Sequence, residues 1–443
     1  MKRSEAVLVK GDIRKTLLKL TLPMMTGFVA MIIFNTADMI YVGRLGGDEL
    51  AAISFTFPVA MLFVGIAQGL GVGAASVVAR AIGAEDLKRG RKVTAYTIFL
   101  ALVVSAAVST TGLLTIEPLF KLMGAEKDIL PLIRDYMEIW YIGMVFVMVP
   151  MIGNNIIRAT GDAKTPMYIM LIAALLNIVL DPFLIFGIGP FPRLELAGAA
   201  AATVISRATT MVVTLKVLKK LRMIEFSVGQ WEELKKSWIS VLHVGAPAAL
   251  TNLLVPISLG ILTYLSSLHG KEAVAALGVG SRIDFIALLP MFGLGASLLP
   301  FVGQNMGAGK KGRIRKALHL SFRFSFYWGF GVTIFAGFFS DYIGLAFTSE
   351  KEILDNLKFY LLIIPVSYSF QGLIRLSTGY FNAVGKPFPA AFLNFLRFLI
   401  LLIPFSAMGN LVYGFVGILG GVSLSGIVPG VLALRWTKKE MDI

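Results

Sequence analysis

The sequence contains no cysteine, only three histidines and few charged residues. Without cysteine, neither a disulfide framework nor a thiolate metal site can form. The histidines lie far apart and form no HExxH-type motif, and no GxxxxGK[ST] sequence is present to cradle a nucleotide phosphate. Charged residues make up 15% of the chain, well below the ~25% of an average soluble domain. These shortages argue against a disulfide-stabilised domain, a metalloenzyme and direct use of ATP.

Apolar residues, in contrast, are in excess. They make up 56% of the chain and give it a mean hydropathy of +0.79. Residues 95–116 and 137–157 each form an apolar block at least as long as the ~20 residues that cross a bilayer as a helix. A segment in lipid must satisfy its own backbone polar groups, and these lengths fit helices rather than the short strands of a barrel. We therefore predict an all-α membrane protein.

Apolar blocks separated by turn residues predict twelve transmembrane helices. The first block follows a basic leader at 1–15 and has no small-residue cleavage site, so we expect it to be retained as a helix. The predicted spans are 16–42, 50–79, 93–116, 131–158, 165–189, 194–218, 239–267, 273–304, 317–340, 356–382, 387–409 and 413–434.

Basic residues are concentrated in alternate loops. Clusters at 2–15, 88–92 and 216–236 alternate with loops that hold far fewer Lys and Arg. The positive-inside rule then places these loops and both termini in the cytoplasm, in a multi-pass protein of the cell membrane. The net charge of +15 follows from this orientation, and no nucleic-acid partner is needed to explain it.

The most polar stretch, residues 219–238, divides the chain. It is amphipathic, and we expect it to lie along the cytoplasmic membrane surface as a linker. It separates an N-terminal lobe at 1–218 from a C-terminal lobe at 239–443, each with six helices.

The two halves resemble each other at a constant offset of 224 residues. Pro23 aligns with Pro247, and the Gly-Leu-Gly sequence at 69–71 aligns with the one at 293–295. Repeats of six helices share one orientation in the membrane, so we expect two pseudo-symmetric lobes around a central cleft. This arrangement is typical of secondary transporters that bind substrate between the lobes, near the bilayer midplane.

Four segments carry a family resemblance. They are residues 20–59 (beginning LTLPMMTGF), 69–92 (beginning GLGVGAAS), 156–167 (IIRATGDAKTPM) and 176–189 (LNIVLDPFLIFGIG). Across essentially the whole chain the sequence resembles the multidrug and toxic compound extrusion family, most closely the branch of the DNA-damage-inducible protein F. The resemblance implies a monomeric transporter without a cofactor, in which H⁺ or Na⁺ enters as amphipathic, often cationic, small molecules leave.

Two carboxylates lie inside predicted spans of the first half. Asp38 follows Asn35 by three residues and Asp181 follows Asn177 by four, so each pair shares a helix face. Ionisable groups are costly within a bilayer and mark functional sites by default. These side chains would take up a proton or hold Na⁺ through their oxygens. The alternative is a hydrogen-bond network between helices that has no role in transport.

The family pattern assigns cation coupling to Asp38, Asn177 and Asp181, and it adds the hydroxyl of Thr203. The repeat supports a specialised site in the first lobe, because the position equivalent to Asp38 in the second half is Leu262. Whether the coupling ion is H⁺ or Na⁺ stays open at this point.

Other side chains are candidates for the substrate path or for its polar network. Pro23 begins the first apolar run, and we predict either a hinge or a fixed kink there, since Pro247 stands at the repeat position. The polar candidates are Asn35, Gln68, Tyr141, Asn154 and Asn155.

The second half carries its own charged residues within the predicted spans. They predict an ion-paired cluster that fixes the packing of the lobe, with a second cation or substrate site as the alternative. Another branch of the family places carboxylates in the seventh and tenth helices, but 239–267 and 359–384 contain none. The members of the predicted cluster are Arg282, Asp284, Arg375 and Arg397.

Other functions fit the sequence less well. A flippase or exporter of a lipid-linked or polar precursor has the same architecture but needs a cationic cleft, whereas the first-lobe acids predict the reverse. The loop motif of major-facilitator transporters is not found, and the acids lack the GxGD-type context of an intramembrane protease. The sequence therefore favours a cation-coupled multidrug antiporter over an enzyme.

Overall fold

The structure, a computed structural model, describes residues 6–224 and 231–441, and nearly all of them are helical. The first lobe consists of η1 (Val7–Val9), α1 (Ile13–Gly43), α2 (Gly47–Gly83), α3 (Leu87–Leu122), α4 (Leu130–Ile142), α5 (Met144–Ala159), α6 (Lys164–Phe186) and α7 (Glu195–Lys220). The second consists of α8 (Trp231–Ser267), α9 (Lys271–Gly307), α10 (Lys311–Leu345), α11 (Lys351–Ile363), η2 (Ile364–Ser367), α12 (Tyr368–Val384), α13 (Pro387–Phe395), the π-helical segment η3 (Leu396–Leu402) and α14 (Ile403–Glu440).

The predicted helical membrane architecture is confirmed. Within the described ranges, nine helical stretches are long and apolar enough to cross a membrane, and α4 with α5 makes a tenth span that is bent by 49°. One of the nine, Pro387–Glu440, is 54 residues long and forms two spans, as shown below. With α10, which packs against α9 and α12, the twelve predicted spans are accounted for.

Helix α14 contains a reversal of the chain. Tyr413 and Gly414 have non-helical dihedral angles, and Gly414 has a positive φ of 58°, which glycine adopts without strain. The segments before and after this point pack side by side in opposite directions. The hydrogen bond that Ser406 Oγ donates to the carbonyl of Ile418 at 3.3 Å joins them. A Cβ on Gly409 would lie 2.1 Å from the carbonyl oxygen of Gly417, so small residues permit this close packing.

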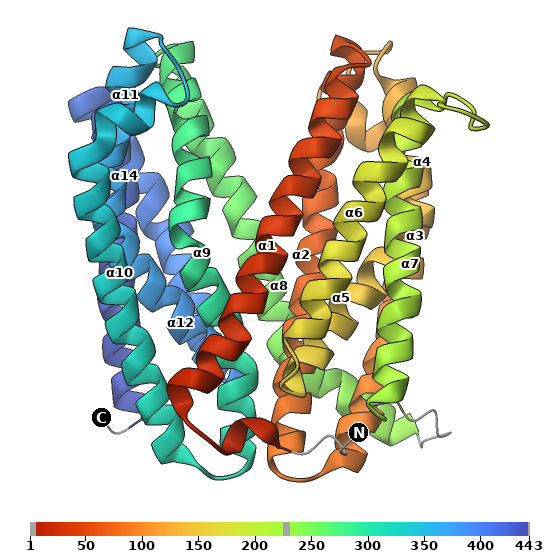
Figure 1. The fold of residues 1–443 in the computed structure, drawn as a ribbon. Coiled ribbons are helices and arrows are strands. Elements are labelled where there is room, and N and C mark those ends of the chain that lie inside the picture. The colour runs from red at the N-terminus through yellow and green to blue at the C-terminus, as the bar shows by residue number, and fades with distance from the viewer. Residues whose placement is uncertain (1–5, 225–230, 442–443) are drawn as a thin grey trace.

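The two lobes meet at one end and diverge toward the other (Figure 1). Helices α1–α7 form the lobe on the right of the view, and α9–α14 form the lobe on the left. Helix α8 begins beside the first lobe, where Trp238 Nε1 donates to the carbonyl of Tyr96, and then runs into the second lobe. Both η1 and the end of α14 lie at the lower end, where the lobes meet.

Glycine in α2 allows the lobes to touch. A Cβ on Gly73 would lie 2.2 Å from the carbonyl oxygen of Val241 in α8, and one on Gly69 would lie 2.5 Å from that of Gly245. The glycine-rich sequence at 69–73 therefore serves close helix packing, as expected inside a membrane. It joins the first lobe to α8.

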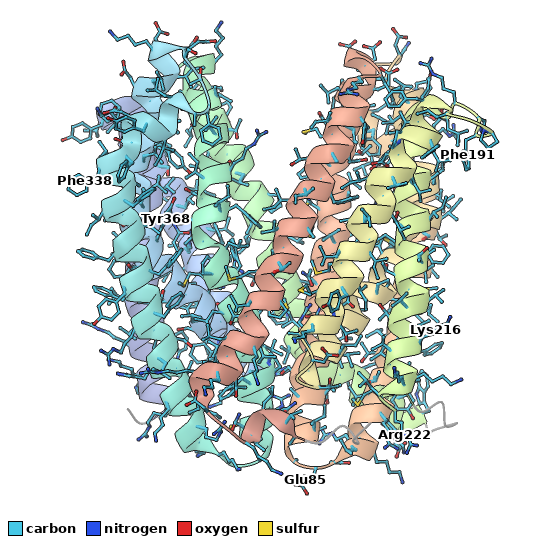
Figure 2. The ribbon with its side chains drawn as sticks, in the orientation of Figure 1. Glu85, Phe191, Lys216, Arg222, Phe338 and Tyr368 are labelled. Carbon is cyan, nitrogen blue, oxygen red and sulfur yellow. The ribbon has the colours of Figure 1, made fainter. Side chains whose placement is uncertain are left out.

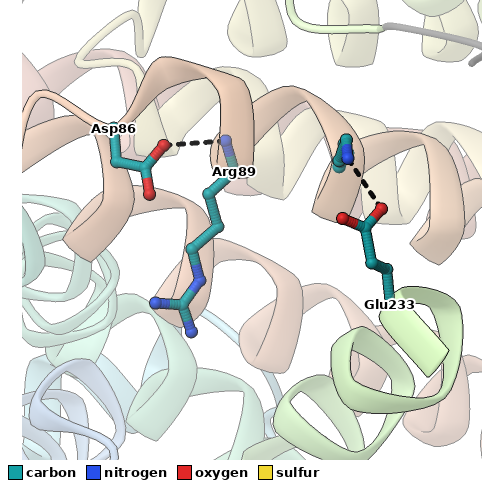
Figure 3. A network of polar contacts seen from close by, with 4 residues as sticks. Asp86, Arg89 and Glu233 are labelled. Atoms are coloured by element: carbon teal, nitrogen blue, oxygen red, sulfur yellow. Dashed lines mark hydrogen bonds and ion pairs between the residues drawn. The ribbon is translucent and has the colours of Figure 1, made fainter. Parts of the chain in front are cut away.

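The polar stretch between the lobes differs in part from the prediction. Helix α8 begins at Trp231, eight residues before the predicted span, and residues 225–230 of the predicted linker lie outside the described residues. The first turns of α8 are held against α3, where Lys92 Nζ and Glu233 Oε2 form an ion pair at 2.6 Å (Figure 3). In the same view Asp86 caps α3 by accepting from the backbone amide of Arg89 at 3.0 Å. The first turns of α8 are therefore docked on the first lobe, and the placement of the linker along the membrane surface stays a prediction.

Loop positions agree with the alternation of basic residues. Glu85, just before the basic residues 88–92 in the first turns of α3, and Arg222, beside the end of α7, lie at the lower end with η1 (Figure 2). Phe191, in the loop between α6 and α7, lies at the opposite end. Phe338 of α10 is 80% exposed and points away from the bundle, as expected of a side chain that faces lipid.

Candidate functional site

Three helices of the first lobe bring its polar candidates together. Asp38 comes from α1, Asn177 and Asp181 lie one turn apart on α6, and Thr203 comes from α7. Helix α6 packs against both α1 and α7. Asn177 and Asp181 are completely buried, and Asp38 is partly buried. The expected juxtaposition of these four residues is therefore present, and we call them the first-lobe cluster.

The first-lobe cluster has more acceptor oxygens than donors. Asn177 Nδ2 donates to Thr203 Oγ1 at 3.2 Å. Both carboxyl oxygens of Asp181, Oδ1 of Asp38 and Oδ1 of Asn177 are buried and have no hydrogen-bond partner in the described part of the chain. Buried polar atoms are nearly always satisfied, so each of these needs an explanation. A proton shared by the carboxyl groups or an oxygen-ligated cation would provide one.

The carboxylates of Asp38 and Asp181 are close enough to interact electrostatically. Asp38 interacts electrostatically with Asp181, and both interact with the buried Tyr136 of α4. Like charges at close range cannot both remain ionised at low cost in a medium of low dielectric constant. The described residues hold no group of three or more His, Cys, Asp or Glu side chains suited to a metal ion. The oxygen atoms available as ligands come from two carboxylates, one amide and one hydroxyl, and such a set suits H⁺ or Na⁺.

A small pocket of about 30 Å³ adjoins the cluster at Thr203. Its wall includes Phe34 of α1 and Arg207 of α7, and the Arg207 guanidinium lies over the Phe34 ring at 5.7 Å. Sequence reasoning did not identify Arg207 or Tyr136. The position of Arg207, one turn after Thr203, was a usable signal, whereas Tyr136 is placed only by tertiary packing.

The remaining first-lobe candidates separate into different environments. Asn155 Nδ2 donates to Gln68 Oε1 at 3.3 Å and its Oδ1 accepts from Arg158 at 2.5 Å, which forms a network between α2 and α5. Asn154 is buried with its Oδ1 unpartnered among the described residues. Asn35 is exposed, so it does not join the buried part of the first-lobe cluster.

Tyr141, a candidate for the substrate path or its polar network, is buried within the first lobe. It is 1% exposed, and its ring packs at right angles to Phe63 and Trp140. A Cβ on Gly112 would lie 2.3 Å from this ring. Tyr141 is therefore a core residue of the first lobe.

Pro23 lies in α1 at the contact between the lobes. The helix is unbroken from Ile13 to Gly43 and Pro23 is buried. Two residues earlier, Thr21 Oγ1 donates to Ser297 Oγ of α9 at 3.2 Å. Asp38 is fifteen residues further along the same helix, about 22 Å at the helical rise of 1.5 Å per residue. Helix α1 thus connects the first-lobe cluster to the other lobe.

The charged residues of the second lobe are arranged differently from the predicted ion-paired cluster. Asp284 accepts hydrogen bonds from Tyr360 at 2.8 Å and Tyr368 at 2.5 Å. None of the ion pairs within the described ranges joins it to an arginine. Arg282 is exposed, because two residues along a helix turn its side chain about 200° away from that of Asp284. The prediction missed both tyrosines.

Asp284, Arg375 and Arg397 line one cavity of about 190 Å³ inside the second lobe, and Arg282 does not. Arg397 Nη2 donates to Gln371 Oε1 at 2.7 Å, and its guanidinium lies over Phe398 at 4.8 Å. The cavity wall is formed by α8, α9, α11, η2, α12, η3 and α14. We call this space the second-lobe cavity.

Comparison with known proteins places the chain among transporters. A model of the MatE family matches residues 23–183 and again residues 247–408, two matches that begin 224 residues apart. A FAD transporter of Shewanella oneidensis is 35% identical over 96% of this chain and 94% of its own length. Multidrug export protein MepA of Staphylococcus aureus is 26% identical over 93% of this chain and 90% of its own. An outward-facing structure of a multidrug resistance MATE family transporter is 26% identical, covers 100% of this chain and 99% of its own, and superposes with a TM-score of 0.92.

Proposed function

This chain belongs to the MatE family of transporters, and we propose that it is a secondary active exporter driven by H⁺ or Na⁺ through the first-lobe cluster. Its small-molecule substrates would be amphipathic compounds that leave the cell as the cation enters. The observation that carries the proposal is the pair Asp38 and Asp181 in one lobe, the first partly and the second fully buried, with buried carboxyl oxygens that no donor of the described residues satisfies. A charge-balancing cation at this point lowers the cost of burying the carboxylates.

Helix α1 offers a physical link between the cation and the lobes. Asp38 lies in the C-terminal half of α1. Thr21, in the N-terminal half, is hydrogen-bonded to Ser297 of α9. Pro23 removes one backbone hydrogen bond between these points, which makes bending easier there. Neutralising Asp38 changes its attraction to its surroundings and would favour a different bend of α1. The contact with the second lobe would change with it, as alternating access requires.

Orientation and assembly complete the proposal. The basic loops share one end with η1 and the end of α14, which supports cytoplasmic termini in the cell membrane. In that orientation the lobes meet on the cytoplasmic side and diverge toward the outside. We propose that the monomer is the functional unit, because both lobes needed for the cleft belong to one chain.

The test is efflux of a fluorescent cationic dye from proteoliposomes under an imposed pH gradient and, separately, an imposed Na⁺ gradient. Asp38→Asn and Asp181→Asn are expected to lose efflux driven by the productive gradient. Asp135→Asn, at an exposed position of α4, is the matched control and should retain it. Efflux that neither gradient drives in the wild-type protein would overturn the proposal.

A second candidate function is the export of a polar, anionic metabolite. The sequence argued against it because the identified acids suggested a cleft of negative charge. The second-lobe cavity contains two arginines and one aspartate, and a FAD transporter is 35% identical to this chain. Both observations favour a substrate with an anionic group, and the same assay with a flavin nucleotide inside the vesicles tests this candidate.

A further inference from the structure

The second-lobe cavity carries an excess of positive charge. Among the residues that line it, the charged side chains are Asp284, Arg375 and Arg397. The rest of the wall consists of apolar side chains, glycine and a few neutral polar groups. Two guanidinium groups against one carboxylate leave one net positive charge in a cavity whose wall is otherwise mostly apolar. The cavity is therefore suited to an anion.

Asp284 is already engaged by other donors. Its Oδ2 accepts from Tyr360 and its Oδ1 accepts from Tyr368. The two tyrosines bind the carboxylate without adding charge, and Arg397 interacts with it electrostatically without forming an ion pair. In the described part of the chain no arginine lies within ion-pair distance of Asp284.

The two arginines retain free hydrogen-bond donors. Arg397 uses Nη2 to bind Gln371, and its Nε is buried without a partner among the described residues. Arg375 lies with its guanidinium 3.9 Å from the centre of the Phe292 ring and is exposed. A guanidinium that stacks on a ring keeps its N–H groups directed outward in its own plane. That geometry suits two-point binding of a phosphate or carboxylate.

Aromatic rings accompany these donors. Phe292 lies beneath Arg375, and Phe398 lies beneath Arg397. Both rings line the second-lobe cavity. A planar aromatic ligand would stack against such faces, in offset or edge-to-face contact, while its anionic group meets the guanidinium groups.

Local departures from α-helix shape this wall. Arg397 and Phe398 lie in η3, a π-helical segment, and Tyr360 precedes the 3₁₀ segment η2 that separates α11 from α12. Interruptions of this kind are frequently found at functional sites, because they redirect side chains that a regular helix would place elsewhere. Their presence on two helices of the same cavity is consistent with a binding role.

The internal repeat shows that the two lobes are specialised in opposite senses. Leu262 of the second-lobe cavity stands at the position of Asp38. Conversely, the position equivalent to Arg375 in the first half is Met151. The paired acids Asp38 and Asp181 therefore belong to the first lobe, and the paired arginines Arg375 and Arg397 belong to the second-lobe cavity. This separation allows a cation and an anionic substrate to bind the same molecule without neutralising each other.

We propose that the second-lobe cavity binds the anionic end of a planar aromatic substrate, through Arg375, Arg397 and Gln371. The anionic group is a phosphate or carboxylate, and the ring system stacks on Phe292 and Phe398. A cavity of about 190 Å³ takes one end of such a molecule, and the rest extends past the exposed Arg375. This inference deepens the second candidate function and rests on the proposed transport function.

The test is equilibrium binding of flavins to the purified full-length protein in detergent, followed by flavin fluorescence. Riboflavin 5′-phosphate and riboflavin share one ring system and differ in the phosphate. We expect the phosphorylated flavin to bind at least about tenfold more tightly, as two-point binding by arginine supports. Arg397→Gln and Arg375→Gln should each reduce this preference to about twofold or less.

Arg282→Gln is the matched control, because it removes an arginine outside the second-lobe cavity and should keep the preference. Melting temperatures of all variants show whether each remains folded, and Arg397→Lys, which keeps the charge, should retain part of the preference. A planar dye that carries a carboxylate in place of phosphate distinguishes the two anions. Equal affinity of the wild-type protein for both flavins, or an unchanged preference in the folded glutamine variants, would overturn the inference.

The flavin-binding measurement needs no cation gradient, whereas the efflux assay does. The cavity assignment and the coupling mechanism can therefore be contradicted independently of each other. If the flavin preference is present but no gradient drives transport, the cavity assignment stands and the coupling mechanism fails. If a gradient drives dye efflux but the flavins bind equally, the coupling mechanism stands and the cavity assignment fails.

Discussion

Asn177 of α6 donates a hydrogen bond from Nδ2 to Thr203 Oγ1 of α7 at 3.2 Å. Because the bond uses an amide hydrogen, the amide oxygen of Asn177 remains an acceptor, and it is buried without a partner among the described residues. The bond also fixes the position of the Thr203 hydroxyl beside the small pocket that includes Arg207. Asn177 and Thr203 thus add acceptor oxygens to the carboxylates of the first-lobe cluster.

Removing the Thr203 hydroxyl should weaken cation coupling. Thr203→Ala loses the hydrogen bond to Asn177 and one potential ligand. A net hydrogen-bond contribution of about 0.5–1.5 kcal/mol corresponds to a roughly two- to tenfold change in affinity. The measurement is the concentration of driving cation that gives half-maximal efflux from proteoliposomes. Thr203→Ser keeps the hydroxyl and should behave as the wild type, so equal behaviour of the alanine, serine and wild-type proteins would contradict this role.

A side chain at Gly73 should disrupt the joint between the lobes. Gly73→Ala places a Cβ 2.2 Å from the carbonyl oxygen of Val241, so α2 and α8 must move apart. Overpacking of this kind costs about 1–3 kcal/mol and should lower the melting temperature of the purified protein. Gly260→Ala in α8 is the control, because its Cβ would meet nothing within 4 Å. A melting temperature of Gly73→Ala equal to that of the control would show that the helices tolerate separation.

Gln304 of α9 is expected to hold the lobes together at the end where η1 lies. Its Oε1 accepts from the backbone amide of Leu8 at 3.0 Å, and its Nε2 donates to the carbonyl of Ala159 in α5 at 2.8 Å. Gln304→Leu leaves both backbone groups unsatisfied, which costs about 1–3 kcal/mol for each buried group. The conformation with the lobes joined at this end should therefore become less populated.

Thiol accessibility measures this change, because the chain contains no cysteine and an introduced one is the only thiol. Ser76 is completely buried between the lobes, where its Oγ donates to the carbonyl of Asn382. Maleimide should label Ser76→Cys slowly, and at least about fivefold faster when Gln304→Leu is added, since ~1 kcal/mol corresponds to this ratio. An unchanged labelling rate would mean that Gln304 does not control separation of the lobes.

The sequence predicted the spans well because lipid makes apolar length a direct signal. Irregularities within spans were not predictable in the same way. The predicted span 131–158 is bent by 49° between α4 and α5, and η3 interrupts the eleventh span with a π-helical segment. These features depend on how neighbouring helices pack, which hydropathy does not record.

For the candidate sites too, some residues were predictable from the sequence and others only from the tertiary structure. Asp38 and Asp181 were recognisable because acids are rare within spans, and the structure brings them together with Asn177 and Thr203. The predicted second-lobe cluster is found in altered form: Asp284 interacts electrostatically with Arg397 but forms no ion pair with an arginine in the described ranges, and Arg282 is exposed. The partners of Asp284 are Tyr360 and Tyr368 from other helices, and only tertiary structure reveals them.

The coupling role of Asp38 and Asp181 is tested most directly by measuring cation movement that the substrate itself drives. Proteoliposomes containing a trapped pH- or Na⁺-sensitive dye are given a substrate gradient and no cation gradient. The account predicts that substrate leaving the wild-type vesicles drives cation uptake. It predicts that Asp181→Asn still exchanges labelled for unlabelled substrate but moves no cation. Cation uptake by Asp181→Asn and Asp38→Asn at the wild-type ratio to substrate would contradict the account.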